Sequence, residues 1–250
     1  MSTGLGRDPR AVPAVAGASA GDALFRPVRA GNAFEETVER LLQAVRLGVV
    51  GAGERLPSER ELAERLGVSR VTLREAIRAL ADAGYVESRR GRYGGTFVKE
   101  SLPAPRAGGR LTDQGALEDT LGLRYVLETG AAELAASRSL TPADRRHLTA
   151  TLAEACTADV SDYRRRDSRL HLAIAEVTGS ASLTSALADV RMRVNELLDE
   201  IPLLEPNLDH SNNQHEAVVE AILAGDSAAA RAAMIEHVEG TASLLRGFLQ

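Results

Sequence analysis

The stretch from Leu56 to Leu80 constrains the fold of this chain more than any other part of the sequence. Ser58, followed by Glu61 three residues later, has the spacing of a capping box, so a helix should begin directly after Ser58. Gly67 should end that helix, because glycine readily adopts the left-handed backbone that helix ends favour. Ser69 is placed to cap a second helix. Two short helices joined by a tight turn are typical of a helix-turn-helix, whose second helix enters the DNA major groove.

The second helix separates an apolar face from a polar one. Its apolar residues recur at three- and four-residue spacing, typical of a buried helix face, and they are Leu73, Ala76, Ile77 and Leu80. The polar residues near its start are Arg70, Thr72 and Arg74. Arginine can pair with guanine O6 and N7, and threonine can contact a base edge or a thymine methyl. The alternative interpretation is a small helical hairpin with a solvated arginine face.

Beyond the second helix, the pattern changes to two short strands over residues 85–89 and 96–99, joined by a glycine-bearing turn. Glycine lets a backbone approach DNA closely, and arginine supplies charge for the phosphates. The residues at this turn are Arg89, Arg90, Gly91 and Arg92. An amphipathic helix over about residues 34–48 completes the pattern, which predicts a winged helix-turn-helix domain over residues 31–100.

Three motifs within this domain are Gly53-Glu-Arg-Leu-Pro-Ser-Glu-Arg-Glu-Leu-Ala, Gly67-Val-Ser-Arg and Arg74-Glu-Ala. Together with the glycine-rich wing, they resemble the GntR family of bacterial transcription regulators over about residues 33 to 99. The resemblance implies binding to double-stranded DNA through Arg60, Arg70, Thr72, Arg74 and Gly91. To these we add, as candidate DNA contacts, Ser69 at the start of the second helix and Arg90 and Arg92 at the wing.

The distribution of charge favours a DNA-binding domain joined to an acidic one. Residues 1–100 hold 16 Lys/Arg against 13 Asp/Glu, a net charge of +3, whereas residues 101–250 hold 14 against 22, a net charge of −8. No apolar run approaches the ~18 residues of a membrane span. Cys156 is the single cysteine, which excludes an intrachain disulfide, so we expect a cytoplasmic location without membrane contact.

The remaining sequence divides into a tail, a linker and a helical domain. Residues 1–30 mix Ala, Gly and Pro without the apolar core of a signal peptide, and we expect a disordered tail. Residues 101–115 are rich in Pro, Gly and Ala, which predicts a linker. Residues 116–250 show only helical patterns, at about 116–137, from 142 onwards, and at about 161–178, 181–203, 209–224 and 227–246. The expected fold is mainly α, with the winged helix-turn-helix domain followed by an antiparallel all-α bundle.

Four polar residues of the bundle have the spacing of a shared metal site. Asp167 and His171 are four residues apart and so lie on one face of a helix, while His215 and His237 lie near the middle of two other helices. Their apolar neighbours indicate that these side chains point inward, where facing helices of a bundle build metal sites. One carboxylate and three imidazoles suit a divalent ion, with zinc preferred over nickel, iron or manganese. Hydrogen-bonded core histidines are the alternative.

A second resemblance strengthens the metal interpretation. The segment Asp167-Ser-Arg-Leu-His171 resembles the Asp-x-x-Phe-His segment of the FCD-type ligand-binding domain of the FadR subfamily, with Leu170 in place of phenylalanine. His215 and His237 match the remaining ligand positions of that domain. The resemblance implies that all four residues bind a divalent metal ion.

The same domain commonly has an arginine in its first helix that faces the effector pocket. The run from Leu123 to Ala136 resembles that helix, and its arginine is Arg124. The resemblance therefore implies that Arg124 binds a small organic acid. The alternative for Arg124 is a salt bridge to Glu128 on a solvated helix face.

These features predict a homodimeric, metabolite-responsive transcription regulator, and a repressor rather than an activator. Each winged helix would read one half of a short inverted repeat, and the bundle would bind the metal ion and the acid. The alternative is a metal-dependent hydrolase with a DNA-binding head, because a metal ion with an open position can activate water. A fused pyridoxal-phosphate enzyme is excluded, since Lys99 at the wing is the only lysine.

Overall fold

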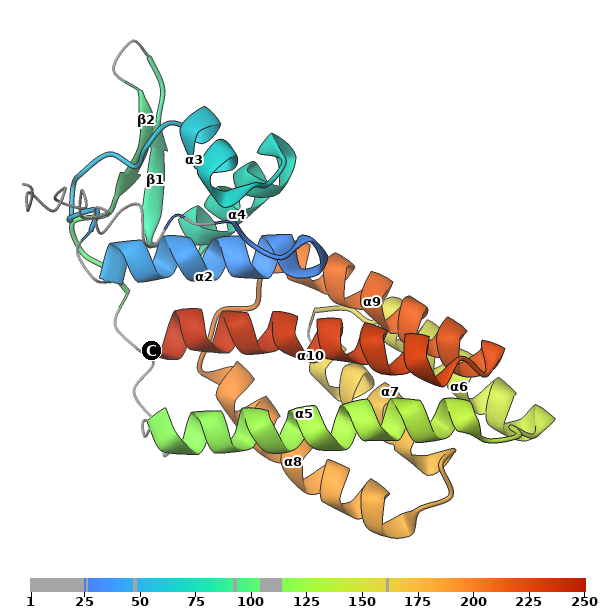
Figure 1. The fold of residues 1–250 in the computed structure, drawn as a ribbon. Coiled ribbons are helices and arrows are strands. Elements are labelled where there is room, and N and C mark those ends of the chain that lie inside the picture. The colour runs from blue at the N-terminus through green and yellow to red at the C-terminus, as the bar shows by residue number, and fades with distance from the viewer. Residues whose placement is uncertain (1–24, 26, 47–48, 92–93, 104–113, 161) are drawn as a thin grey trace, which may run out of the picture.

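The computed structural model describes residues 25, 27–46, 49–91, 94–103, 114–160 and 162–250. Within these residues, the first helices are the 3-10 helix η1 (Ala30–Asn32) and α2 (Ala33–Arg46), α3 (Glu59–Leu66) and α4 (Arg70–Asp82). The strands β1 (Val86–Arg89) and β2 (Gly95–Val98) follow. The rest is helical, with α5 (Gln114–Ser137), α6 (Pro142–Cys156), α7 (Tyr163–Glu176), α8 (Ala181–Asp199), α9 (Glu205–Ala224) and α10 (Ser227–Leu249). The predicted mainly-α fold is confirmed (Figure 1).

The helix-turn-helix forms for the local reasons that the sequence indicates. The Ser58 hydroxyl accepts a hydrogen bond from the Glu61 amide at the start of α3. Gly67 ends α3 with a φ of 67°, in the left-handed region that glycine tolerates. Ser69 caps α4 by accepting from the Thr72 amide at 3.0 Å. The apolar residues of α4 are buried, so its other face is left to the solvent.

The two strands form the antiparallel hairpin predicted for the wing, with Val86 opposite Val98 and Arg89 opposite Gly95. Gly91 lies in the connection with a φ of 109°, and a Cβ at this position would meet no atom within 4 Å. The hairpin projects from the same side of the molecule as α3 (Figure 1). Arg92, which we predicted at the wing, lies outside the described residues.

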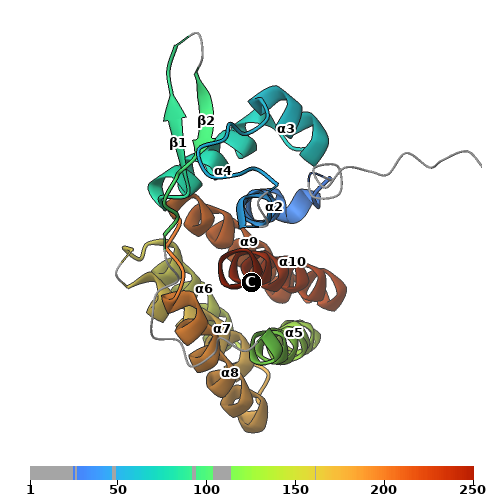
Figure 2. The ribbon, with the colours of Figure 1, turned by 90° about the vertical axis from the view of Figure 1, so that its left-hand side faces the viewer.

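Helix α10 connects the two halves of the molecule. It packs against α5 and α9 on the bundle side and against α2 on the other side. Two views at right angles show α10 between α2 and α5 (Figure 1 and Figure 2). One apolar cluster spans both halves, since it includes Leu41 and Leu42 of α2 together with Leu245 and Phe248 of α10. The winged domain is therefore packed onto the bundle along α10.

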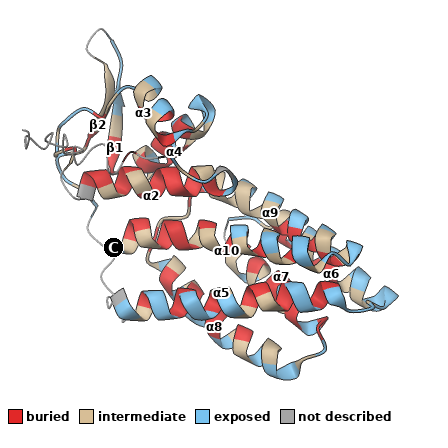
Figure 3. Ribbon diagram, in the orientation of Figure 1, coloured by how far each residue is buried: buried red, intermediate tan, exposed pale blue. Residues whose placement is uncertain are grey.

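A second apolar cluster lies within the bundle and is built mainly from α5, α7, α9 and α10. Buried positions line the facing sides of these helices, while their outer sides are exposed (Figure 3). Several residues in this interior are polar, which is unusual enough to require an explanation. They include the predicted metal ligands.

Some boundaries differ from the sequence prediction. Helix α8 ends at Asp199 rather than near residue 203, and α9 begins at Glu205 rather than 209. Proline explains both differences, because Pro202 cannot continue a helix whereas Pro206 is tolerated in a first turn. Phe25, assigned to the tail, is buried in the core that also contains α2. Most of the predicted tail and linker lies outside the described residues.

Candidate functional site

Three helices bring the four candidate metal ligands together. Asp167 and His171 come from α7, His215 from α9 and His237 from α10, and one ligand atom from each lies within 4.8 Å of all the others. All four side chains are buried. The His215 and His237 ring centroids are 4.4 Å apart, and that of His171 is 5.3 and 5.0 Å from them. The structure thus brings together the four residues that the sequence analysis named as candidate ligands.

Asp167 lies at the centre of this cluster. Its Oδ1 is 3.2 Å from His215 Nε2 and 3.7 Å from His171 Nε2. Neither imidazole nitrogen forms a hydrogen bond of acceptable geometry within the described part of the chain. Buried polar atoms without partners are rare in folded proteins and call for an ion or water. Three imidazoles and a carboxylate are also the donor set of many divalent-metal sites.

Two further buried charged residues lie in the cluster, namely Glu128, which the sequence analysis named only as a salt-bridge partner on a solvated face, and Arg191, which it did not single out. Glu128 of α5 lies 2.7 Å, through Oε2, from His171 Nδ1, and Arg191 of α8 donates to Asp167 Oδ2. Arg191 Nη1 also lies 3.4 Å from Glu128 Oε1. The sequence did carry one signal, because Arg191 continues the apolar stripe of α8 formed by Leu187 and Val194. An arginine on such a stripe indicates a buried charge with partners.

Arg124 lies inside the same cluster, with only 1% of its surface exposed. Its Nε is 3.2 Å from Glu128 Oε1, so the alternative salt bridge is present, but it is buried rather than solvated. Arg124 Nη2 also lies 3.5 Å from His237 Nε2. Arg124 Nη1 and Arg191 Nε are buried donors without a hydrogen-bond partner among the described residues. The cluster therefore has unused capacity to bind an anion.

Burial and charge set the ionisation of the cluster. Burial alone would raise the pKa of the Glu128 and Asp167 carboxyls, but Arg124 beside Glu128 and Arg191 beside Asp167 outweigh it, so both values are well below the ordinary range. Burial lowers the pKa of His215 and His237, which keeps both imidazoles neutral at pH 7. Burial also opposes charge on His171, but the Glu128 carboxylate raises its pKa. Ionised carboxylates and neutral imidazoles are the forms that bind metals.

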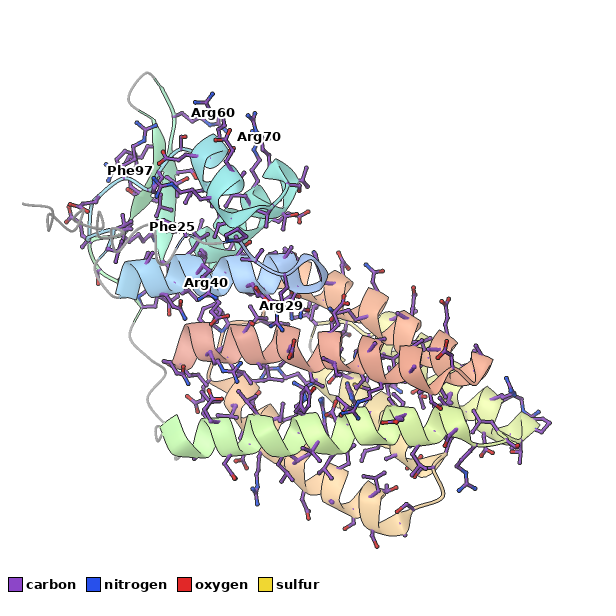
Figure 4. The ribbon with its side chains drawn as sticks, viewed as in Figure 1. Phe25, Arg29, Arg40, Arg60, Arg70 and Phe97 are labelled. Atoms are coloured by element: carbon purple, nitrogen blue, oxygen red, sulfur yellow. The ribbon has the colours of Figure 1, made fainter. Side chains whose placement is uncertain are left out.

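The candidate DNA contacts lie at the outer end of the winged domain. Arg60 and Arg70 are exposed and point away from the bundle (Figure 4). Arg90 and Gly91 are exposed on the hairpin. The structure therefore leaves these residues accessible to a DNA duplex, on the side of the molecule opposite the helices that carry the candidate metal ligands.

Three candidate DNA contacts have partners within the protein. Arg74 Nε donates to Glu59 Oε2 of α3 at 2.7 Å, and both side chains remain largely exposed. The Ser69 and Thr72 hydroxyl oxygens are 2.8 Å apart and share a hydrogen bond. Exposed pairs of this kind contribute only about 0–1 kcal/mol, so a phosphate or base can replace either partner.

A groove lies between α3 and the wing, with a volume of about 440 Å³. Three arginines line it, namely Arg55, Arg60 and Arg89. Sequence reasoning did not include Arg55 among the DNA contacts. Arg55 is held beside the wing by a backbone bridge to Phe97 of β2, and its side chain lies so close to Gly95 that a Cβ there would come within 2.4 Å of Arg55 Nε. A groove with three cations is suited to a phosphate of the DNA backbone.

Comparison with known proteins separates the chain into the same two parts. Residues 34–98 match the model of the bacterial regulatory proteins of the gntR family, and residues 119–240 match the FCD domain. None of the described helices is both long enough and apolar enough to span a membrane.

Relatives cover nearly the whole chain. The "Putative L-lactate dehydrogenase operon regulatory protein" of Escherichia coli K12 is 31% identical over 226 residues, which are 86% of this chain and 86% of that protein. LutR of Bacillus subtilis 168, an HTH-type transcriptional regulator, is 29% identical over 82% of this chain and 98% of its own. The solved structure of Streptococcus agalactiae GntR is 28% identical, covers 84% of this chain and 98% of its own, and has a TM-score of 0.44. The matched family models and the two sequence relatives are those of regulators, and they do not support the hydrolase alternative.

Proposed function

The chain belongs to the GntR family of bacterial regulatory proteins and is a transcription regulator rather than an enzyme, and from this we propose a homodimeric repressor controlled by a divalent metal ion and a small organic acid. The winged domain would bind one half of an inverted-repeat operator in the cytoplasm. The FCD domain would hold the metal ion and the acid.

The observation that carries the metal proposal is the convergence of Asp167, His171, His215 and His237 around unpartnered nitrogen atoms. Glu128 also supports the metal proposal, because its carboxylate lies beside His171 Nδ1 while His171 Nε2 faces Asp167. Metal-bound imidazoles are commonly oriented by a carboxylate on the second ring nitrogen. When bound, the ion would supply positive charge and positions for an acid's oxygens.

The charges of the site support an anionic effector. Arg124 and Arg191 balance Glu128 and Asp167, and two of the imidazoles are neutral, so a divalent ion would add about two uncompensated positive charges. Buried charge without compensation is costly, which favours a bound anion. The unpartnered nitrogens of Arg124 and Arg191 can donate to it. A hydroxy acid or dicarboxylic acid fits this polar site better than a long-chain acyl thioester. The E. coli relative, whose name refers to an L-lactate dehydrogenase operon, agrees with a hydroxy acid.

A twofold arrangement is supported by the outer surface of α5. Leu123, Val126 and Leu134 are exposed there, at 41%, 65% and 42% of their surface, and share one helix face. Gly122 and Gly130 lie on that side too, and a Cβ on either would meet no atom within 4 Å. Glycine inside a helix costs roughly 1 kcal/mol, so open glycines beside exposed apolar residues favour a closely packed second copy.

Elemental analysis tests the metal site. Protein purified without chelator should carry about one divalent ion per chain, and the double substitution His171→Ala and His237→Ala should remove it. The ion should raise the Tm of the wild type, because a ligand that binds only the folded state stabilises it. His147→Ala is the matched control, since His147 is exposed and pairs with Glu176. A full metal load in the double variant would exclude these ligands.

Calorimetric titration of hydroxy and dicarboxylic acids tests the effector site. Arg124→Lys keeps a positive charge but loses the planar fork, so the affinity should fall by about 10-fold or more. Metal-stripped protein should also bind weakly. Arg231→Ala, an exposed change on α10, should leave binding unchanged. Unchanged affinity after loss of both the metal ion and the Arg124 guanidinium would refute the mechanism.

A further inference from the structure

Gln214 of α9 lies between the four candidate metal ligands and the winged domain, and it has hydrogen-bond partners on both sides. Its Oε1 is 3.3 Å from Nδ1 of His237, a candidate metal ligand. Its Nε2 donates to Asn32 Oδ1 at 3.0 Å and to the Gly31 carbonyl oxygen at 3.4 Å. Gly31 and Asn32 belong to η1, which leads directly into α2. A chain of two side-chain hydrogen bonds therefore joins the cluster to the DNA-binding domain.

The partners of Gln214 determine which atoms donate. Two oxygen acceptors lie beside Nε2, so the amide nitrogen must face η1 and the amide oxygen must face His237. An amide oxygen can only accept, and His237 Nδ1 must therefore carry the proton. The lone pair of His237 is then on Nε2, the nitrogen on the Arg124 side of the ring. Gln214 thus presents His237 in the form that binds a metal.

Helix α10 packs very closely against η1 and α2 around these hydrogen bonds. A Cβ on Gly240 of α10 would lie 2.8 Å from Asn32 Oδ1, and a Cβ on Gly247 would lie 3.0 Å from the Glu39 Cα. On the other side, a Cβ on Gly31 would lie 2.3 Å from the carboxyl carbon of Glu236. His237 is on the same helix as Gly240. Such close packing leaves little room for η1 and α10 to move independently of each other.

We propose that Gln214 couples the metal site to the DNA-binding domain, by positioning His237 and holding Asn32 in one hydrogen-bond chain. The inference rests on the proposed function, since it takes His237 as a metal ligand. Metal binding requires the His237 form that Gln214 stabilises, and the docked η1 orients Gln214 for that contact. Coupling of this kind is reciprocal, so a change in the DNA-binding domain must alter metal affinity.

Metal affinity, measured by competition with a chromophoric chelator using Zn²⁺, tests the coupling. Gln214→Leu removes all three hydrogen bonds of the Gln214 side chain and should lower the affinity by about 10- to 100-fold. Asn32→Ala, a change in the other domain, should lower it several-fold in the wild-type background and not at all in the Gln214→Leu background. Asn213→Ala, an exposed amide on α9, should bind Zn²⁺ as the wild type does. A merely structural role for Asn32 would produce equal losses in both backgrounds.

The Gln214→Glu variant tests the hydrogen bond to His237 and the hydrogen bond to Asn32 separately. Its carboxylate still accepts from His237, so Zn²⁺ affinity should remain within a few-fold of the wild type, but it cannot donate to Asn32. The ratio of operator affinities with and without Zn²⁺ should therefore move towards one. This variant leaves Asn32 intact and so tests the coupling even if Asn32→Ala does not fold.

Four outcomes are decisive. Wild-type affinity for Zn²⁺ in Asn32→Ala, or a wild-type Zn²⁺ effect on DNA binding in Gln214→Glu, overturns the coupling while the metal site stands. A wild-type chain that binds no Zn²⁺ through His237 overturns the proposed metal site, and the coupling with it. Losses confined to the wild-type background support the coupling.

Discussion

Glu35 is a carboxylate buried where α2 meets α10, and it forms no salt bridge with the described residues. The side chain is 2% exposed, and its Oε2 has no hydrogen-bond partner among the described residues. Burial raises the pKa of Glu35, a backbone hydrogen bond and His210 oppose the rise, and Glu236 and Glu36 add to it. A carboxyl whose pKa is raised in the folded state costs stability when it is ionised. The domain contact therefore carries a pH-dependent cost.

Glu35→Gln should remove this cost. At a pH above the raised pKa, where Glu35 is ionised, the variant should be more stable than the wild type, with a Tm higher by about 2–4 °C for each kcal/mol gained. As pH falls through the raised pKa towards the ordinary value of 4.5, Glu35 becomes protonated in the folded wild type, and the difference should shrink. Thermal unfolding of both proteins across that range is the measurement. Glu64→Gln, an exposed change on α3, should give no such trend.

Helix α4 has a buried face and an exposed face, and one arginine of the exposed face forms a salt bridge within the protein. Leu73, Ala76 and Leu80 hold the helix against the rest of the winged domain, so its first turn has a defined direction. The salt bridge between Arg74 and Glu59 holds the arginine side chain against the start of α3. The element thus supplies a rigid support and one weakly held cation.

Arg74→Ala should weaken specific operator binding by roughly 1–3 kcal/mol, because a bidentate contact to guanine would be lost. Fluorescence anisotropy with labelled operator and scrambled DNA measures the effect. Arg78→Ala is the matched control, since Arg78 is an exposed arginine of the same helix, on the side that faces α9. Equal losses in the two variants would indicate a general charge effect, and would contradict a base contact by Arg74.

At the scale of the whole molecule, one chain supplies one winged DNA-binding domain, and an inverted repeat requires two such domains. The winged domain and the α5 surface lie on different sides of α10 (Figure 2). A dimer formed through α5 would therefore leave both winged domains accessible. Metal or effector binding could then alter the relation of the two heads through α10, which contacts α2 and α5 alike.

Val126→Glu should convert the proposed dimer to a monomer at micromolar concentration, because the change would bury a charge against an apolar surface. Sedimentation equilibrium measures the mass, and operator affinity should fall with it, since two half-sites are no longer bound together. Val160→Glu places the same charge at another exposed valine and should change neither property. A Val126→Glu protein that remains dimeric would show that the second copy binds elsewhere.

Interactions between near neighbours let the sequence by itself determine the helix-turn-helix, the wing and the six helices of the bundle. Caps such as Ser58 and Ser69, and the φ of Gly67, act over three or four residues, so their effect is readable without a structure. The same four-residue spacing placed Asp167 and His171 on one face. The family resemblance then joined them to His215 and His237.

Only the tertiary structure decided which other residues enter the site. Arg191 and Glu128 are 63 residues apart, and a charged residue on a helix is solvated unless packing brings it a partner. Gln214 and Asn32 are 182 residues apart, and their contact depends on how α2 lies along α10. Such contacts arise from the packing of whole helices, which no local pattern encodes, and the second of them joins the candidate metal site to the DNA-binding domain.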